Sequence, residues 1–212
     1  MEELGITYEV TSIKFDDVKK KPLIDINPNG RVPAIEDPNT DQYDTKQSLT
    51  YTALGDKHHL NQWLHFQMSG QGPYYGTAAW FVNLHPERVP TAIDRYTKQV
   101  TRVLGVLEGW LDGRKWLVGD KMTFADMAWA SWNDRVDTAL GVPEPHKFDG
   151  FPDIKAWHDR MTACASWKRS MELRARLMDE QGLQWNGIPK GITSFAEYEA
   201  MIKAGQDTSP KE

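Results

Sequence analysis

A chain of 212 residues with a formal net charge of −5 is long enough for one large domain or two small ones. Its basic residues are not clustered and no apolar run approaches the length of a membrane span, which argues against nucleic-acid and membrane partners. The single cysteine, Cys164, excludes an intrachain disulfide framework and a cysteine zinc cluster. The start, Met1-Glu2-Glu3-Leu4, has neither the cationic residues nor the apolar segment of a signal peptide, so we expect a soluble cytoplasmic protein.

The first 40 residues predict a small α/β domain. Residues 6–13 are rich in β-branched residues and predict a strand, and residues 16–25 predict a short basic helix or turn. The run Asn27-Pro28-Asn29-Gly30 predicts a turn that leads into a second strand, Val32 to Glu36. Its second residue, Pro33, places this strand at an edge, at a bulge or at a cis bend. A surface turn that merely enters a strand explains the same pattern.

A linker and a series of helices follow. Residues 41–56 show neither helical nor strand periodicity of apolar residues and are expected to form the linker. A helix begins near His58, and the run Gly70-Gln71-Gly72-Pro73 is expected to break or kink it before residues 74–84 resume it. Residues 87–111 carry an apolar stripe typical of an amphipathic helix with one buried face.

The next helices are marked by a capping signal and by apolar periodicity. Thr123-Phe124-Ala125-Asp126 has the form of a capping box, which accounts for Thr123 and Asp126 as structural residues. Ile154, Trp157, Met161 and Cys164 share one face of a later helix, and residues 166–180 form the last long helix. Ser194 is expected to cap a short helix in the tail. We therefore expect an N-terminal domain at 1–40, a linker at 41–56, a helical domain at 57–182 and a tail at 183–212.

Three runs of this sequence resemble glutathione S-transferases. Residues 26–35 resemble the third strand of that family, and residues 61–76 and 116–126 resemble parts of its helical domain. The run at 61–76 resembles the fungal class that includes the yeast nitrogen-catabolite regulator. The resemblance extends from residue 2 to about residue 178. It implies an α/β plus all-α fold with a truncated thioredoxin-like N-terminal domain, a helical C-terminal domain, a homodimer, and a glutathione site where the two domains meet.

The sequence also departs from the pattern of that family. Glu2-Glu3-Leu4-Gly5 aligns with the end of the family's first helix, so the first strand and the catalytic Ser, Tyr, Cys or Asn that follows it have no counterpart here. Aligning Tyr43-Asp44 with the family leaves no room for the fourth strand and its Glu-Ser-Gly motif, although a second alignment puts Gln47 and Ser48 near that motif. No catalytic residue is therefore assigned. The strand at 6–13 would lose its neighbour, and a sheet of two strands is marginal in water.

The resemblance places the glutathione site around the opening turn and strand. The backbone of Val32 can pair with the cysteinyl part of the peptide as a short strand would. Lys19 aligns approximately with a basic residue that contacts the glycyl carboxylate, and Arg31 lies close by in sequence; for both, a solvated surface charge is the favoured interpretation. The residues expected to bind glutathione are Lys19, Arg31, Val32, Pro33, Gln47 and Ser48.

The resemblance also implies an apolar pocket for a second substrate on the helical domain. The residues expected to line it are Phe66, Gln71, Tyr74, Tyr75, Trp132 and Asn133. Aromatic residues at helical spacing more often belong to a core, and Phe66, Trp129 and Trp132 are open to that interpretation. Tyr74 and Tyr75 follow the expected Gly-Pro break, where a hydroxyl could polarise a carbonyl. Cys164 is interpreted as an inert core thiol, and His58, His59 and His65 do not form a metal site.

Three functions remain open from the sequence. The favoured one is glutathione-dependent trans-to-cis isomerisation of a conjugated double bond, as in fungal biosynthetic relatives, by reversible addition of a thiolate. This chemistry consumes no glutathione and tolerates a weak thiol activator when the substrate is strongly electrophilic. The alternatives are conjugation of glutathione to an electrophile and a non-catalytic binding or regulatory role. The expected cofactor is glutathione, and the expected partners are a small hydrophobic electrophile and a second copy of the chain.

Overall fold

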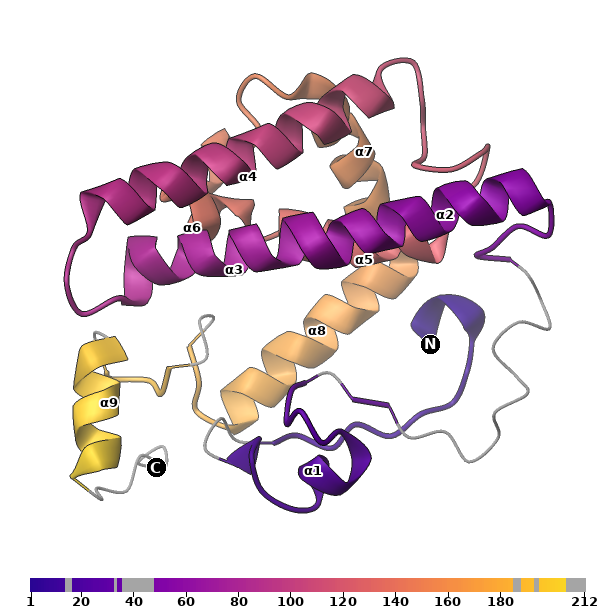
Figure 1. Cartoon of the computed structure of the whole chain (residues 1–212). Helices are drawn as coiled ribbons and strands as arrows, with labels where there is room; N and C mark the ends of the chain where they lie inside the picture. The colour runs from indigo at the N-terminus through magenta and orange to yellow at the C-terminus, as the bar shows by residue number, and fades with distance from the viewer. Residues whose placement is uncertain (14–16, 33, 36–47, 185–187, 193–194, 205–212) are drawn as a thin grey trace. The chain divides into compact units, whose positions relative to one another are not determined.

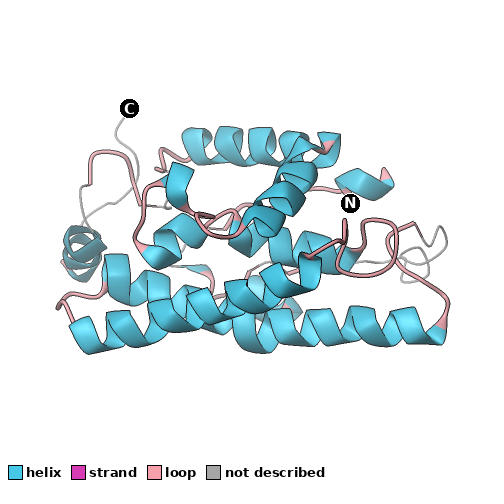
Figure 2. Ribbon diagram, turned by 90° about the horizontal axis from the view of Figure 1, so that it is seen from above, coloured by secondary structure: helices cyan, strands magenta, loops and turns pink. Residues whose placement is uncertain are grey.

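The computed structural model describes residues 1–13, 17–32, 34–35, 48–184, 188–192 and 195–204. The chain forms two compact units, Met1–Gln47, here called the N-terminal unit, and Ser48–Glu212, here called the helical unit. Figure 2 draws the described residues as helices and loops, without a strand ribbon. In the parts of the chain that the structure describes, no helix is long and apolar enough to cross a membrane.

Neither predicted strand is formed among the described residues of the N-terminal unit. Among its described residues the regular elements are a 3-10 helix, η1 (Glu2–Leu4), and one short helix, α1 (Leu23–Ile26). Residues 6–13 and the described residues of 32–36 carry no strand. Val10, Val32 and Ile35 are at least half exposed. The prediction of strands was wrong because β propensity reflects packing against neighbouring strands, and here the described residues offer no sheet to pack against.

The described residues of the helical unit form helices joined by loops (Figure 1), with an isolated β-bridge between Leu183 and Pro189. Its first elements are α2 (Leu54–Phe66), η3 (Gln67–Gln71), α3 (Gly72–Ala79), η4 (Trp80–Leu84) and α4 (Pro90–Leu111). The later elements are α5 (Phe124–Asn133), α6 (Val136–Leu140), η5 (Glu144–His146), α7 (Pro152–Ala163), α8 (Ala165–Glu180) and α9 (Phe195–Lys203). Of these, η3 and η4 are π-helical turns and η5 is a 3-10 helix.

The expected break at Gly70-Gln71-Gly72-Pro73 does not occur. The elements α2, η3, α3 and η4 run on without interruption as one rod beside α4 in Figure 1. In η3 the Gly72 N–H donates to the carbonyl of Gln67, five residues back. Pro73 then occupies the first turn of α3, where a residue without an N–H is tolerated. The predicted break was wrong, because the π-helical turn changes the hydrogen-bond register before the proline; the alternative of a kink stays a prediction.

The core of the helical unit lies between α4 and the helices around it. The apolar stripe predicted on residues 87–111 is confirmed, since five of its members are fully buried on α4. These members are Val100, Val103, Leu104, Leu107 and Leu111. Trp129 and Trp157 fill the same core, and the Trp129 indole N–H donates to the carbonyl of Trp63 at 2.9 Å. An indole buried with its N–H paired costs no hydrogen bond, which is why tryptophan can serve as core here.

The predicted capping box at the start of α5 is confirmed, and Asp126 does more than cap. Its Oδ2 accepts from the backbone N–H of Thr123 at 2.8 Å and from the Thr123 hydroxyl at 2.9 Å. Its Oδ1 accepts from the Leu117 N–H at 3.0 Å and from the Trp157 indole N–H at 2.9 Å. All four donors meet one fully buried carboxylate. Asp126 therefore joins the preceding loop, α5 and α7.

Cys164 was expected on a helix face but lies between two helices. Its extended backbone, with φ −60° and ψ 141°, ends α7 and begins α8. Its thiol donates to the Arg160 carbonyl at 3.4 Å and is partly exposed. The face formed by Ile154, Trp157 and Met161 is confirmed as buried. The short tail helix is confirmed as α9, whereas its predicted cap, Ser194, lies outside the described residues.

Replacing Asp126 by Ala should lower the free energy of unfolding by about 3 kcal/mol or more, because it leaves four buried donors without an acceptor. Urea denaturation measures this loss. The matched control is Asp94→Ala, which removes only an exposed ion pair with Lys98 and should cost about 0.5 kcal/mol or less. Equal losses in the two variants would contradict the role given to Asp126.

Candidate functional site

In the N-terminal unit the run Asn27 to Arg31 folds into a tight turn, here called the asparagine turn. The Gly30 N–H donates to the Asn27 carbonyl at 2.7 Å, and the Asn27 side-chain amide donates to the Arg31 carbonyl at 2.8 Å. The Asn29 N–H donates to the Asn27 side-chain oxygen at 3.2 Å. The predicted turn is confirmed, and asparagine directs it by bonding to its own backbone.

Glycine at position 30 lets the asparagine turn approach the chain at residues 18 and 19. Gly30 has a φ of 58°, and a Cβ there would lie 2.6 Å from the Val18 carbonyl oxygen. The ammonium of Lys19 donates to the carbonyl of Asn29 on the same turn. The structure therefore brings Lys19 to the turn that carries Arg31 and Val32, with all three side chains exposed.

The structure describes one of the remaining residues expected to bind glutathione, Ser48. Pro33, with its expected cis bend, and Gln47 lie outside the described residues. Ser48 belongs to an exposed turn at the start of the helical unit. The chemistry available around the asparagine turn is therefore that of exposed cations and backbone groups, which suits a carboxylate-bearing peptide.

In the helical unit, three of the expected pocket residues form a buried hydrogen-bond network. The Gln71 side-chain amide donates to the Trp129 carbonyl at 3.1 Å and to the Asn133 side-chain oxygen at 3.0 Å. The Tyr75 hydroxyl donates to the same Asn133 oxygen at 3.1 Å. Gln71, Tyr75 and Asn133 are at most 1% exposed. This network fastens η3 and α3 to α5.

The expectation that Tyr75 stands at an opening in the helix was wrong. The helix continues through Pro73, so Tyr75 points into the core of the unit. Burial raises the pKa of the Tyr75 phenol far above its ordinary value, which keeps the phenol protonated as a donor to Asn133. Its role in the described structure is to hold α3, whereas contact with a substrate would require the network to open.

The aromatic candidates divide between core and surface. Phe66 packs against Trp63 and Trp129, with ring centroids 6.0 Å and 5.2 Å apart, which is the core alternative that the sequence left open. Tyr74 is partly buried on α3, under the guanidinium of Arg102. Trp132 is 37% exposed on α5.

The indole of Trp132, on α5, lies close to two glycines of α3. A Cβ on Gly72 or Gly76 would lie 3.7 Å or 3.6 Å from the indole, which is an ordinary van der Waals contact. The indole meets Tyr75 edge to face. Trp132 is therefore the expected pocket residue that is classed as exposed, and its ring contacts Tyr75 of the buried network.

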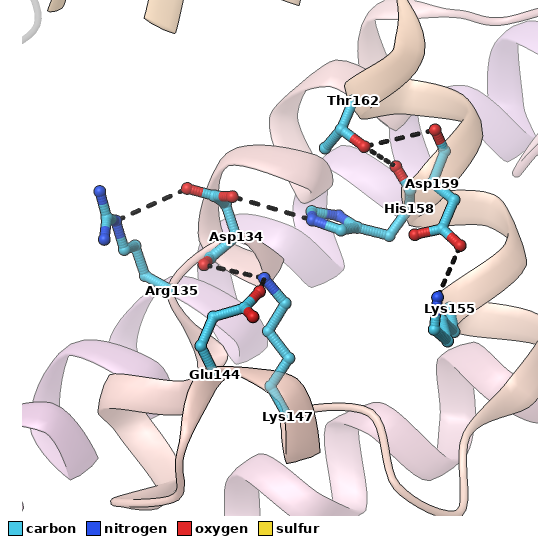
Figure 3. Close-up of polar contacts among 8 residues, drawn as sticks. All are labelled: Asp134, Arg135, Glu144, Lys147, Lys155, His158, Asp159 and Thr162. Carbon is cyan, nitrogen blue, oxygen red and sulfur yellow. Dashed lines mark hydrogen bonds and ion pairs between the residues drawn. The ribbon is translucent and has the colours of Figure 1, made fainter. Parts of the chain in front are cut away.

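Sequence reasoning missed a polar cluster around His158, drawn in Figure 3. The buried His158 ring lies with Nε2 3.9 Å from one carboxylate oxygen of Asp134, whose other oxygen lies 3.6 Å from the Arg135 Nε. Lys147 is also largely buried and pairs with Glu144 at 2.9 Å. The one signal in the sequence was the position of His158 four residues after Ile154, next to the buried face of α7.

The electrostatics of this cluster keep His158 neutral. Burial, reinforced by the positive charge of Lys147, lowers the pKa of His158 to about 4. The carboxylates of Asp134, Asp159 and Glu144 oppose that shift. Within the described ranges no group of three His, Cys, Asp or Glu side chains is arranged to hold a metal ion.

His158 should make the helical unit sensitive to acid. The unfolded chain binds a proton on this histidine near pH 6.5 and the folded chain only near pH 4, so its contribution to stability is complete above pH 6.5. About 3 kcal/mol should be lost as the pH falls from 6.5 to 4. The variant His158→Gln should flatten this part of the curve of unfolding free energy against pH, and the exposed His65→Gln should not. An identical curve for His158→Gln and the parent would refute the assignment.

The Gln71 network should show coupling in a double-mutant cycle. Tyr75→Phe removes the hydroxyl and should cost about 1 kcal/mol of unfolding free energy, and Asn133→Ala should cost about 2 kcal/mol because it leaves two buried donors unpaired. The double variant should lose about 1 kcal/mol less than the sum, since both changes break the same bond. Strict additivity in urea denaturation would show that the two residues act independently.

Comparison with known proteins agrees with this architecture. Residues 73–164 match the glutathione S-transferase C-terminal domain. The glutathione S-transferase-like protein gedE of Aspergillus terreus is 43% identical over 188 residues, covering 77% of this chain and 83% of gedE. The glutathione S-transferase-like protein tpcF of Aspergillus fumigatus is 40% identical over 193 residues, covering 80% of this chain and 86% of tpcF.

Among solved structures, the glutathione transferase URE2P6 from Phanerochaete chrysosporium, in complex with oxidized glutathione, superposes with a TM-score of 0.74. It is 35% identical, over 83% of this chain and 88% of URE2P6. The chain belongs to the glutathione S-transferase family, in the fungal class related to Ure2p. Its fold is accordingly the glutathione S-transferase fold with a helical C-terminal domain.

The match with gedE also shows that this chain is shorter inside the matched region. Since 77% of 212 residues is about 163 residues, about 25 of the 188 matched positions have no counterpart here. A difference of that size is enough for a strand and the start of a helix.

Proposed function

We propose that this protein is a glutathione-dependent enzyme that isomerises a conjugated double bond from trans to cis. The observation that carries the glutathione part is the asparagine turn, which Lys19 contacts at the Asn29 carbonyl and which ends at Arg31, next to Val32 in the chain. Its relative URE2P6 is described in complex with oxidized glutathione, which supports the same ligand here. We further propose that the enzyme is a cytoplasmic homodimer.

The reaction begins when the glutathione thiolate attacks an enone at its β-carbon, or attacks a polyene conjugated to a carbonyl group, forming a C–S bond and moving an electron pair to the carbonyl oxygen. The former double bond is now single and rotates. The enolate then re-forms the double bond and expels the thiolate, so that glutathione is returned unchanged. No proton has to be retained on the carbon skeleton.

Isomerisation is favoured over conjugation by the residue types around the asparagine turn. None of the residues of the asparagine turn, 27–31, carries a hydroxyl or a thiol that could activate glutathione directly, and neither does Lys19. Two cations remain, Lys19 and Arg31, and a nearby cation helps to form a thiolate. A strongly electrophilic substrate supplies the rest of the driving force. The exposed indole of Trp132 offers a flat apolar surface for such a conjugated substrate.

Conjugation is the second candidate, favoured by the similarity to glutathione S-transferase-like proteins such as gedE. A non-catalytic binding role is the third. Incubation with glutathione and a trans dienone, followed by the olefinic coupling constants in NMR spectra, separates them. Isomerisation changes the coupling constant at constant thiol concentration. Accumulation of a conjugate with loss of thiol would refute the isomerase proposal, and absence of both would favour the binding role.

The glutathione site is tested by removing its cations. Lys19→Ala and Arg31→Ala should each weaken glutathione binding roughly tenfold in a calorimetric titration, because each removes a charged partner of a carboxylate. The control Lys98→Ala, on the exposed face of α4, should leave the affinity unchanged. Unchanged affinity in the Lys19 and Arg31 variants would place the glutathione site elsewhere.

A further inference from the structure

Trp132 lies in the last turn of α5, where the bonds of the helix itself hold a side chain least firmly. The helix ends at Asn133, and residues 134–135 form a turn before α6. The carbonyls of a last helical turn have no following turn to pair with. The position of the Trp132 indole therefore depends on the contacts between this end of α5 and the rod that packs against it.

Two donors from the rod meet one oxygen at this end of α5. Gln71 and Tyr75 lie four residues apart and so share one face of the rod. Both donate to the side-chain oxygen of Asn133, at 3.0 Å and 3.1 Å. Two bonds from one face to one atom fix the rotation of the rod relative to Asn133.

The residues that follow each donor meet the indole. Gly72 and Gly76 come one position after the two donors, and a Cβ on either would lie 3.7 Å or 3.6 Å from Trp132. The Tyr75 ring meets the same indole edge to face, with ring centroids 6.4 Å apart. A rotation of the rod that breaks the bonds to Asn133 would therefore also move the surface against which the indole lies.

Stability alone is a poor explanation for polar residues at these positions. Gln71 and Asn133 are fully buried, and the Gln71 Oε1 and the Asn133 Nδ2 bond to no described residue. Apolar side chains of the same shape would fill this space without the cost of removing amides from water. Positions that depart from the most stable choice are typical of functional sites.

We propose that Asn133 is a positioning residue that holds the Trp132 indole in the orientation that receives the conjugated part of the substrate. This inference rests on the proposed function, in which the exposed indole offers the apolar surface. Asn133 is fully buried, so it acts through Trp132 rather than by touching the substrate. An indole held in one orientation loses less freedom when a flat ligand lies on it, which strengthens binding.

The orientation of the indole is tested by fluorine NMR with 5-fluorotryptophan at the nine tryptophan positions, where Trp132→Phe identifies the Trp132 resonance. Asn133→Ala and Gln71→Met should each shift or broaden this resonance, because each removes a bond between the rod and α5. The matched control Glu108→Ala also removes the acceptor of two bonds between helices, at the start of α7, and should leave the resonance unchanged. An unchanged resonance in either network variant would overturn the proposal.

A conservative variant separates the acceptor oxygen from the rest of the side chain. Asn133→Asp keeps the oxygen to which Gln71 and Tyr75 donate and replaces the nitrogen, which bonds to no described residue. Burial favours the neutral acid, whose carbonyl oxygen still accepts both bonds. Asn133→Asp should therefore restore the Trp132 resonance of the parent protein. A resonance like that of Asn133→Ala would refute the role given to the oxygen.

Kinetics test whether the orientation matters to the substrate. In Asn133→Ala, KM for the trans dienone should rise roughly three- to tenfold at constant kcat, because the indole supplies binding that is equal in the ground state and the transition state. Glu108→Ala should change neither constant. In the double variant Trp132→Phe/Asn133→Ala, KM should equal that of Trp132→Phe alone. Effects that multiply would show that Asn133 acts independently of the indole and would refute positioning.

Failure of the proposed function is recognised separately. A parent protein that neither binds glutathione nor isomerises the dienone would refute the proposed function, and the fluorine resonance would still decide whether Asn133 orients the indole. A resonance that shifts in Asn133→Ala while KM stays at the value of the parent protein would overturn the positioning role.

Discussion

The buried carboxylate of Asp126 is the interaction on which the helical unit depends. One oxygen satisfies the start of α5 and the other satisfies the loop before it and the indole of Trp157 on α7. A buried charge is tolerated only with such complete pairing. Through α5 the same constraint extends to Trp129 and Asn133, which receive the amide of Gln71 from η3.

The π-helical turn η3 explains how one long helical rod, from α2 to η4, can direct its side chains at α5. A π-helical turn carries one more residue than an α-helical turn, so it rotates the faces of the helix that follow it. With η3 in place, Gln71 and Tyr75 both reach Asn133, and Trp132 lies against Gly72 and Gly76. The run that looked like a helix break is therefore what aims these side chains at α5.

The N-terminal unit differs from the helical unit in the interactions that order it. Its described order comes from local bonds, such as those of the asparagine turn and the contact of Lys19 with it, rather than from an apolar core. Leu23 is its buried hydrophobic residue among those described, and several other apolar side chains are exposed.

The sequence by itself determined the features that depend on residues a few positions apart. The capping box at Thr123 and Asp126, the buried stripe of α4 and the asparagine turn are all of this kind, because their signals lie within one or two helical turns or one turn of chain. The family resemblance was also available, since its motifs are contiguous runs.

Only the tertiary structure decided which long-range partners each residue finds. Tyr75 is buried against Asn133, His158 lies beside Lys147 and Asp134, and Tyr51 reaches Asp120, at separations of up to 70 residues that no periodicity reveals. The β-rich run at 6–13 failed as a strand for the same reason, because a strand exists only when another strand pairs with it. Neighbouring residues determine where helices and turns form, whereas the burial of a side chain and its long-range partners depend on the fold of the whole chain.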